Sequence, residues 1–403
     1  MRAALDHGPV ARSTVARIAG LSPAAVSRQC AELIRRGLLR EIPGPHPPAG
    51  RPHIPVDIDT ERAVVCGAHI ALRHTTLAVL DLRGRVLARD QIPHPAAPDP
   101  GQVLDQVAAA LPPFLASTAL ASTAMASTTM AGTTMARAGR HRVAGIGVAT
   151  GGWVDSGAGV IAGHPLLGWH DIHVRDQLER LTGLPVRVDG HARAMVRAEE
   201  LFGDQRARSS AVHLFAGNVV DAAFAVGGSV HHGPRSAAGA VAHLPVPGRT
   251  DPCDCGAAGC LQAVASDGAL AAQAVAAGIE PAESGPAGNP PVSPLAALLT
   301  AARAGDTRAV DLFRRRAQAI GAAVATLLGM LNPGVLIVAE AGVMHLPGCL
   351  DALRTEVRDR CPHWPWDDSP EPPVIASSFG SDVLAVAAGT VMLAEIYADP
   401  SAI

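Results

Sequence analysis

Four side chains able to ligate a metal lie close together in the middle of the chain. His243 precedes a loop reading PCDCGAAGC, which supplies thiols at Cys253, Cys255 and Cys260. One imidazole and three thiolates are the ligand set of a closed tetrahedral zinc site, which leaves no coordination position for a substrate. The alternative is that these are ordinary reduced cysteines, or that two of them form a disulfide. Because three of the seven cysteines occupy one Gly-rich loop, we predict a structural zinc at His243, Cys253, Cys255 and Cys260.

Composition places the chain among soluble globular proteins. It has 403 residues, of which 48% are hydrophobic and 17% charged, and this length corresponds to about two to three domains. No apolar run of about 18 residues and no signal-peptide pattern is present, so we expect a cytoplasmic, nucleoid-associated protein without a membrane partner. Seven cysteines, an odd number, also fit a reducing compartment.

Positive charge is concentrated at the N-terminal end. Residues 1–51 contain eight arginines and three acidic residues, a net charge of +5, whereas the whole chain carries −3. The remaining residues therefore carry about −8. This distribution is expected when one module of a protein binds a polyanion.

Residues 12–39 have the pattern of two short amphipathic helices. A tight turn at Gly20 and Leu21 separates them, and the second begins with Ser22 as N-cap and Pro23 in the first helical position. Its apolar stripe is Val26, Cys30, Leu33 and Ile34, and Gly37 ends it. This pattern predicts a helix-turn-helix within a domain of residues 1–58.

The second of these helices would present polar side chains to the major groove, with Arg28 and Gln29 reading bases and Arg35 and Arg36 further along. The Pro-rich segment 43–58 is typical of a wing, and its Arg51 could enter the minor groove or contact phosphate. The alternative is a helical hairpin that binds protein. The predicted DNA-binding residues are Ser22, Ala24, Ser27, Arg28, Gln29 and Arg51.

From residue 59 onward strands and helices alternate, which predicts an α/β domain over 59–403. Two apolar strands are expected from Val64, closed by a turn at Arg83 and Gly84, followed by a helix over 101–115. Residues 116–136 repeat small residues with a period of about five and predict a disordered or loosely helical insertion. Later segments predict a strand over 143–149, a long helix ending at Leu331, and a final strand and helix from Val374.

The motifs and their order resemble the ROK family of repressors, open reading frames and sugar kinases. The resemblance is most specific at GAVAH (239–243) and CDCGAAGCLQ (253–262). It implies a winged helix-turn-helix followed by a two-lobed, actin-like (ribonuclease H-like) ROK domain. The resemblance extends over essentially the whole chain, because it includes both of these parts.

Several positions depart from the pattern of the family's kinases. The first phosphate loop reads HIALR, with His69 in place of Asp and no glycine pair, and the second reads GNVVD from Gly217. Ala339 and Glu340 replace a Gly-Gly pair, and His191 in DGHAR replaces the general-base Asp. Phosphoryl transfer depends mainly on positioning the nucleotide. We therefore expect no kinase activity and no catalytic residues.

The resemblance also implies an effector pocket whose sugar-binding set is reduced. Gly190, His191 and Ala240 replace three of its polar residues, His243 remains, and Gln262 replaces a Glu. Trp169 could stack on a sugar ring or could serve only in packing. The predicted effector residues, for a sugar or sugar derivative, are Trp169, Gly190, His191, His243 and Gln262.

These observations favour a transcriptional repressor that binds double-stranded operator DNA as a homodimer or homotetramer, controlled by an effector through a shift between conformations. One alternative is a ROK sugar kinase with an N-terminal DNA-binding extension. Another is a regulator that senses no small molecule and whose kinase-like domain only mediates dimerisation.

Overall fold

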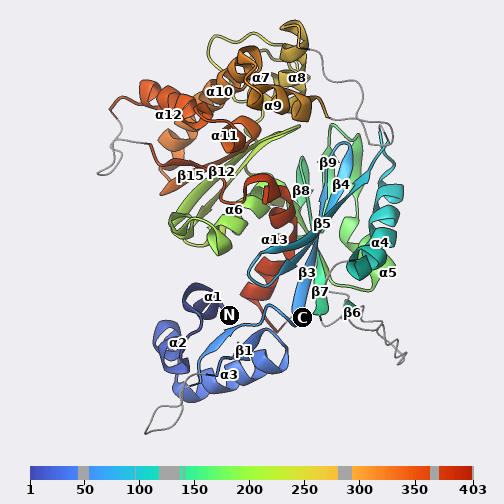
Figure 1. Cartoon of the computed structure of the whole chain (residues 1–403), viewed down its shortest axis with the longest axis vertical. Helices are drawn as coiled ribbons and strands as arrows, with labels where there is room; N and C mark the ends of the chain where they lie inside the picture. The colour runs from blue at the N-terminus through green and yellow to red at the C-terminus, as the bar shows by residue number, and fades with distance from the viewer. Residues whose placement is uncertain are drawn as a thin grey trace. The chain divides into compact units, whose positions relative to one another are not determined.

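The computed structural model describes residues 1–43, 54–95, 97–117, 137–138, 141–279, 293–363 and 372–401. By contacts between residues, the chain divides into two compact units. Unit 1 comprises Met1–Thr150, Val154–Ala194 and Leu384–Ile403, and unit 2 comprises Gly151–Trp153 and Met195–Val383. Each unit has its own sheet (Figure 1). The predicted insertion 116–136 lies almost entirely outside the described residues, as does Arg51.

Unit 1 begins with the predicted helix-turn-helix. Its elements are α1 (Arg2–His7), α2 (Arg12–Ala19), α3 (Pro23–Arg35), β1 (Leu39–Glu41) and β2 (Val56–Ile58). Gly20 has a left-handed φ of 63°, which ends α2, and Ser22 Oγ accepts a hydrogen bond from Ala25 N at 3.3 Å, which caps α3. Strands β1 and β2 pair antiparallel at the base of the expected wing. Contacts group these residues with unit 1, and a separate domain 1–58 stays a prediction.

The main sheet of unit 1 has the strand order β11-β7-β3-β4-β5. Neighbouring strands pair antiparallel in β3–β4 and β4–β5 and parallel in β3–β7 and β7–β11. The sequence predicted two strands from Val64, and the structure has three, because β5 follows the turn at Arg83 and Gly84. The strands are β3 (Ala63–Ile70), β4 (His74–Asp81), β5 (Val86–Pro93), β7 (His141–Thr150) and β11 (Val186–Gly190), with β6 (Arg137–Ala138) paired to β7.

Helices cover both faces of this sheet. The apolar side chains of α4 (Pro100–Ser117) and α5 (Val174–Thr182) pack with alternate strand residues such as Cys66 and Ala68. Gly67 points to the other face, where a Cβ atom would lie 2.6 Å from Gly389 N in α13 (Val383–Ala398). A separate three-stranded sheet of β8 (Trp153–Asp155), β9 (Val160–His164) and β10 (Trp169–Ile172) follows β7 in the chain.

The helical stretch Gly380–Ala398 is long and apolar enough to cross a membrane by length and composition alone, although 56% of its apolar window is buried. Its backbone packs against the unit 1 sheet, since a Cβ on Gly147 would lie 2.1 Å from Ala388 O. A core helix of a globular protein has these properties as well.

The sheet of unit 2 has the order β14-β13-β12-β15-β16. Its first hairpin is antiparallel, and β15 and β16 add in parallel, as β7 and β11 do in unit 1. The two sheets thus repeat one topology, which agrees with the predicted two-lobed domain. The strands are β12 (Ser210–Ala216), β13 (Val220–Val226), β14 (Ser229–Val230), β15 (Val335–Glu340) and β16 (Val374–Ala376).

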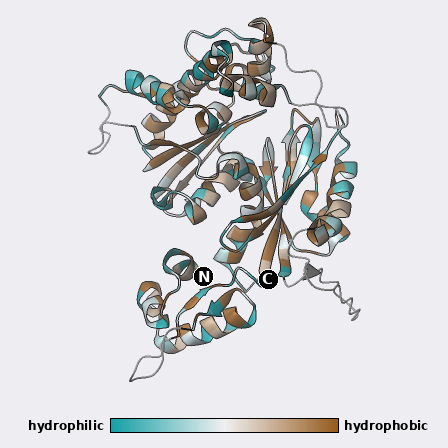
Figure 2. Ribbon diagram, in the orientation of Figure 1, coloured by the Kyte–Doolittle hydropathy of each residue, from teal (hydrophilic) through white to brown (hydrophobic). Residues whose placement is uncertain are grey.

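The core of unit 2 surrounds α10, whose buried residues Phe313, Ala317, Ile320, Val324 and Leu328 recur at helical spacing. Full burial of such large apolar side chains contributes roughly 1.5–3 kcal/mol each. Hydrophobic residues dominate the central strands of both sheets, such as β3 and β15, whereas β5 at one edge is mostly exposed (Figure 2). The helices are α6 (His191–Phe202), α7 (Leu261–Ala265), α8 (Asp267–Ala276), α9 (Pro294–Arg303), α10 (Thr307–Leu331), α11 (Ala341–His345) and α12 (Cys349–Arg360).

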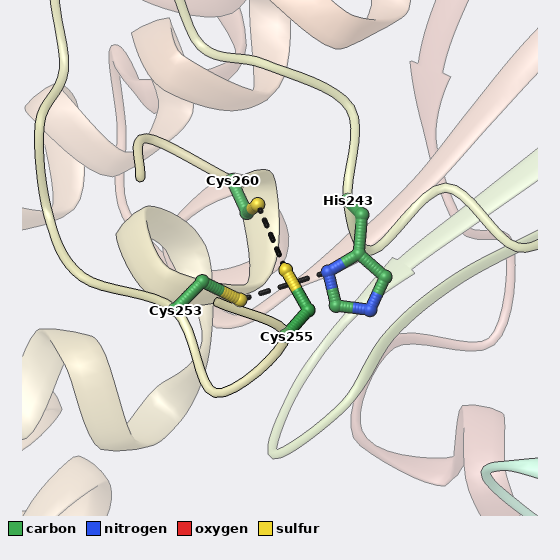
Figure 3. A group of neighbouring side chains, drawn as sticks. All are labelled: His243, Cys253, Cys255 and Cys260. Atoms are coloured by element: carbon green, nitrogen blue, oxygen red, sulfur yellow. Dashed lines mark hydrogen bonds between the residues drawn. The ribbon is translucent and has the colours of Figure 1, made fainter. Parts of the chain in front are cut away.

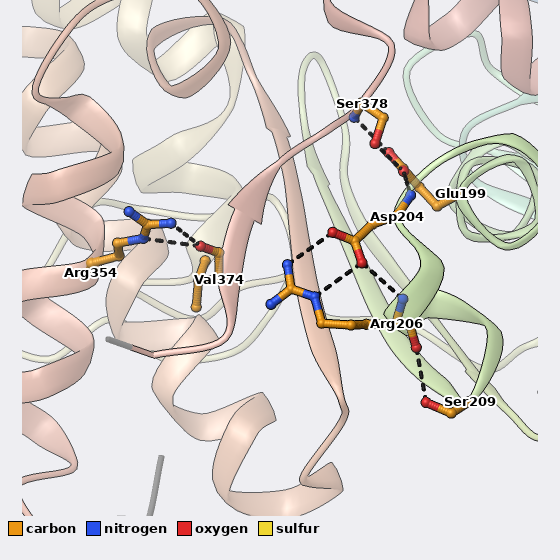
Figure 4. A network of polar contacts seen from close by, with 7 residues as sticks. All are labelled: Glu199, Asp204, Arg206, Ser209, Arg354, Val374 and Ser378. Carbon is orange, nitrogen blue, oxygen red and sulfur yellow. Dashed lines mark hydrogen bonds and ion pairs between the residues drawn. The ribbon is translucent and has the colours of Figure 1, made fainter. Parts of the chain in front are cut away.

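A buried carboxylate joins α6 to the segment after β16 (Figure 4). Glu199 accepts hydrogen bonds from Ser377 Oγ at 2.9 Å, Ser378 N at 2.8 Å and Ser378 Oγ at 2.7 Å. Nearby, Asp204 forms a bidentate pair with Arg206, while Arg354 donates to Val374 O. These contacts connect α6 to the segment after β16, and α12 to β16 itself, within unit 2.

Candidate functional site

The four predicted metal ligands come together in unit 2. Suitable ligand atoms of His243, Cys253, Cys255 and Cys260 all lie within 4.8 Å of one another. His243 Nδ1 is 3.6 Å from Cys253 Sγ, and Cys255 Sγ is 3.7 Å from Cys260 Sγ (Figure 3). Distances of this size fit donors around one shared ion, and the Cys₃His set suits a metal that prefers sulfur and imidazole nitrogen.

Backbone hydrogen bonds and glycines shape the loop that carries the thiols. Cys253 N donates to Ala257 O, and Gly256 N donates to Cys253 O, both at 2.9 Å. Gly259 has a φ of 71°, and a Cβ there would lie 2.4 Å from Arg249 O. A side chain is therefore excluded at this position, which explains the glycine in the motif.

The thiols have different environments. A hydrogen bond from the backbone of Ala257 is the main cause that lowers the pKa of Cys255, an exposed residue. Desolvation is the main cause that raises the pKa of Cys260 to about 11. Because a metal binds thiolates, binding at this site must release protons and must weaken in acid.

The metal loop supports a second loop through Gln262. Cys260 is the N-cap of α7, and Gln262 lies in the first turn of this helix. Its Oε1 accepts from Val220 N at 2.8 Å, and its Nε2 donates to Asn218 O at 2.7 Å. Gln262 therefore fixes the GNVVD loop, and any effector contact would use its remaining hydrogen-bonding capacity.

In unit 1, two of the substituted kinase positions contact each other. His69 at the end of β3 and His191 at the start of α6 are 3% and 2% exposed. His69 Nε2 lies 3.4 Å from His191 Nδ1, and the rings stack with centroids 5.7 Å apart. Two imidazoles thus fill the place where the family resemblance puts a phosphate loop and a general base.

The electrostatics at His69 favour a neutral imidazole. Burial lowers the pKa of His69 well below its usual value. The nearby imidazoles of His191, His74 and His164 lower it further. Asp189, the acidic residue two positions before His191, is held by Arg193 Nε at 2.6 Å and by Gly190 N at 2.7 Å. That carboxylate is engaged within the protein.

Two further positions where the family's kinases bind the nucleotide, the β3–β4 turn and Glu340, are engaged in contacts within the protein. Ala71 N donates to His74 O at 3.0 Å, which closes a tight β3–β4 turn, and the half-buried Leu72 packs on the core. In unit 2, Glu340 is 1% exposed, caps α11 at Val343 N and pairs with the buried Arg316 at 3.2 Å. An internal ion pair therefore stands at the position of the family's Gly-Gly.

Trp169 and Gly190 are both buried. Trp169 is 3% exposed and donates its indole N–H to Pro98 O at 2.8 Å. Of the two roles that the sequence left open, this geometry fits packing. Trp169, Gly190 and His191 belong to unit 1, whereas His243 and Gln262 belong to unit 2. The effector pocket stays a prediction.

The predicted DNA-contacting residues of the N-terminal segment 1–58, which we call the head, lie on and beside α3. Ser22, Ala24, Ser27, Arg28 and Gln29 are all exposed. Ala24, Ser27 and Arg28 lie away from the buried Val26 and Cys30, whereas Gln29 lines a pocket between the N-terminal helices and the residues that follow α13. The structure thus gives Arg28 a fully outward position and Gln29 a position at the margin of the outward face.

Two features of these sites were missed by reasoning from the sequence. The contact of His69 with His191 joins residues 122 positions apart. The pair of Arg316 with Glu340 joins α10 to the end of β15. Arg316 follows two other arginines, so its sequence context does not distinguish it, whereas Glu340 ends an apolar strand, and such a charge marks a buried partner but does not identify it.

Comparison with known proteins yields a family match and regulator relatives. Residues 117–395 match the model of the ROK family. The chain is 33% identical to the transcriptional regulator Rv0485 of Mycobacterium tuberculosis, over 99% of this chain and 85% of that protein. It is 23% identical to the N-acetylglucosamine repressor of Escherichia coli O157:H7, over 87% of this chain and 82% of that protein.

Solved structures agree on the fold. A ROK family transcriptional regulator, a homologue of the E. coli MLC protein, superposes with a TM-score of 0.73 at 22% identity, covering 98% of this chain and 94% of that one. A ROK hexokinase from Thermus thermophilus gives a TM-score of 0.60 at 25% identity, covering 83% of this chain and 100% of that one. The regulator thus matches nearly the whole chain, including the N-terminal head.

Proposed function

This chain belongs to the ROK family, and from that premise we propose that it is a transcriptional repressor that binds operator DNA through α3 and transfers no phosphate. The observation that carries the proposal is the capped, outward-facing α3 at the N-terminal end of the chain, where positive charge is concentrated. The regulator relatives support it, since they extend over the head as well as the ROK domain. Such a protein works in the cytoplasm, on the nucleoid.

DNA recognition by one short helix gives limited affinity, so we propose a homodimer or homotetramer that places two heads on two half-sites. The natural probe is a duplex that the protein itself selects from randomised DNA. An inverted repeat among the selected sequences, together with a dimeric or tetrameric mass in solution, is expected. Equal binding of every duplex would refute the proposal.

Arg28→Ala tests the recognition helix. Loss of a base-reading arginine costs roughly 1–3 kcal/mol of discrimination and relaxes the preference at one position of each half-site. Fluorescence anisotropy with selected and scrambled duplexes measures both effects. Arg17→Ala is the matched control, because Arg17 is equally exposed but belongs to α2. An unchanged preference in Arg28→Ala would show that α3 does not read bases.

We further propose that the kinase-like part of the chain is inactive. His69 and His191 contact each other at the positions where the family's kinases have the phosphate loop and the general base, and Asp189 is paired with Arg193. Incubation with ATP, magnesium and a panel of hexoses and amino sugars is expected to give no sugar phosphate. Turnover that disappears in His191→Ala would identify the chain as a sugar kinase with a DNA-binding extension instead.

The metal group is proposed to hold zinc in a structural role. All four donors are protein side chains, so a tetrahedral ion would have no open position. When bound, zinc would supply crosslinking of the loop. His243, Cys253, Cys255 and Cys260 would position α7 and Gln262, and through Gln262 the loop from Gly217.

The effector is proposed to be a sugar or sugar derivative, in keeping with the name of the N-acetylglucosamine repressor among the relatives. Gln262, which keeps hydrogen-bonding capacity beyond its bonds to Val220 N and Asn218 O, is proposed to contact the effector, and the other predicted effector residues stay predictions. A ligand that binds only the native state at one hundred times its Kd stabilises that state by about 2.7 kcal/mol. Thermal-shift screening of free sugars measures this. No shift with any sugar would favour a regulator without a small-molecule effector.

A further inference from the structure

The C-terminal end of α3 is bound directly to the chain that follows α13. Arg36, the C-cap of α3, donates from Nη1 to Ser401 O at 2.9 Å and to Pro400 O at 3.3 Å. Its Nε donates to Glu32 Oε1 at 2.6 Å, which holds the guanidinium in place. These contacts join the recognition helix to residues 399–401, which we call the α13 tail.

A second arginine binds the other side of the head. Arg83, in the turn between β4 and β5, pairs with Asp57 of β2. It also donates to Ala4 O and Leu5 O of α1, both at 3.4 Å. Tyr397 near the end of α13 donates its hydroxyl to Leu82 O at 2.6 Å, beside this turn. The turn and α13 are therefore linked where they meet the head.

Apolar packing between α3 and α13 is incomplete. A cavity of about 660 Å³ lies among α1, α2, α3 and the α13 tail, lined by residues that include Val15, Leu33, Tyr397 and Pro400. Arg36 lines this pocket, and its hydrogen bonds to Pro400 O and Ser401 O connect α3 to the α13 tail beside it.

Arg35, the neighbour of Arg36, has a different environment. Its side chain is 71% exposed, compared with 25% for Arg36, and its ion pair with Glu32 lies within α3. On a helix, Arg35 shares the outward face of Arg28, whereas Arg36 is turned toward the cavity. Of these two adjacent arginines, Arg35 therefore faces the side proposed to bind DNA, and Arg36 faces inward.

We propose that Arg36 and Arg83 are positioning residues that set the angle of the recognition helix by binding the α13 tail, α1 and β2. This inference rests on the proposed function. α13 begins where the chain leaves unit 2, at Val383 and Leu384. A shift of this helix along its axis would be transmitted to α3 through Arg36, which gives the ROK domain a direct connection to the DNA-binding surface.

The test compares Arg36→Ala, Arg35→Ala and a truncation after Ala398, on the full chain otherwise. The probe is a duplex that the wild-type protein selects from randomised DNA. Affinity is measured at several salt concentrations for the selected and a scrambled duplex. Circular dichroism and thermal unfolding establish that each variant is folded. A wild-type protein that selects no DNA sequence would contradict the proposed function. Once a duplex has been selected, the variants test the positioning role of Arg36 separately.

Arg36→Ala is expected to lose about tenfold in affinity for the selected duplex, as for the loss of one charge-assisted hydrogen-bond group, with an unchanged salt slope. Arg35→Ala is expected to weaken both duplexes alike and to lower the salt slope by about one, as for a lost phosphate contact. Arg83→Ala should follow Arg36→Ala.

The truncation supplies the decisive comparison, because it removes the carbonyl partners of Arg36 and leaves the arginine intact. The truncation, Arg36→Ala and the two combined are expected to lose the same affinity. Additive losses would show that Arg36 acts independently of the tail and overturn the proposal. A salt slope lowered by about one in Arg36→Ala would assign it to a phosphate and overturn the proposal as well. A truncated protein that fails to fold would leave the decision to that salt slope.

Discussion

The metal loop of unit 2 and the imidazole pair of unit 1 have departed from the family pattern to different degrees. At the metal loop all four donors are present, the spacing is intact, and glycines hold the turn. At the imidazole pair, a carboxylate and a phosphate loop are replaced by His69 and His191, which stack on each other. The ligand set of the proposed structural site is retained, whereas two imidazoles stand at the positions of the kinase residues. This difference supports the proposal of a regulator that transfers no phosphate.

The largest expected effect comes from removing one thiol of the metal loop. Cys255→Ser should abolish stoichiometric metal binding and lower the free energy of unfolding by roughly 4 kcal/mol, which corresponds to about 10 °C in the unfolding temperature. Cys255 is exposed, so the serine itself should fit without strain. Elemental analysis and calorimetry measure the two quantities.

Cys361→Ser is the matched control for this experiment, because Cys361 is a free, half-buried thiol of unit 2 outside the cluster. It should keep the metal. If Cys255→Ser held as much metal as the wild type and unfolded at the same temperature, the loop would have no structural role. The contrast between a retained metal loop and a substituted imidazole pair would then be wrong for the metal loop.

The next effect concerns acid and the imidazole pair. Burial lowers the pKa of His69 below its ordinary 6.5, so the unfolded chain binds more protons than the folded chain in weak acid. Stability present above pH 6.5 is therefore lost as the pH falls below it, by up to about 1.4 kcal/mol per pH unit for this group. Urea unfolding between pH 7.5 and 5.5 measures the slope.

His69→Gln should flatten part of that slope, with the remainder due to other histidines such as the half-buried His74 and the buried His94, whose pKa values desolvation also lowers. His170→Gln is the control, because His170 is exposed. Equal slopes in the wild type and His69→Gln would mean that the pair tolerates a charge, as a centre built for proton transfer would.

The smallest expected effect comes from Gln262→Glu, which restores the glutamate of the family pattern beside the metal loop. Gln262→Glu replaces the donor to Asn218 O by an oxygen, at a contact of 2.7 Å. The loss should be about 1 kcal/mol at pH 7.5, larger than in Gln262→Ala, because two oxygens then face each other. As the pH falls toward the ordinary carboxyl pKa of about 4.3, the new side chain takes up a proton and can donate again, so the difference between the two variants should shrink in urea unfolding. A stable Gln262→Glu at both pH values would show that Gln262 does not hold the loop.

Local patterns predicted much of the fold and part of the sites. Ser22 and Pro23 placed the start of α3 correctly, since capping acts over a few residues. The metal ligands were predicted together because three of them lie in one short loop. The third strand of the first sheet was missed, because β5 has mostly exposed residues and little hydrophobic signal.

The sequence by itself determined which donors and which substitutions the chain carries, since His243, Cys253, Cys255 and Cys260 have the types and spacing of a metal site and His191 stands in place of the family's Asp. The tertiary structure decided how the substituted positions are used. His69 meets His191, Arg316 meets Glu340, and Arg36 meets the α13 tail, over separations of 122, 24 and 365 residues. Contacts of this kind arise from the packing of strands and helices that are distant in the chain, and no local pattern carries them.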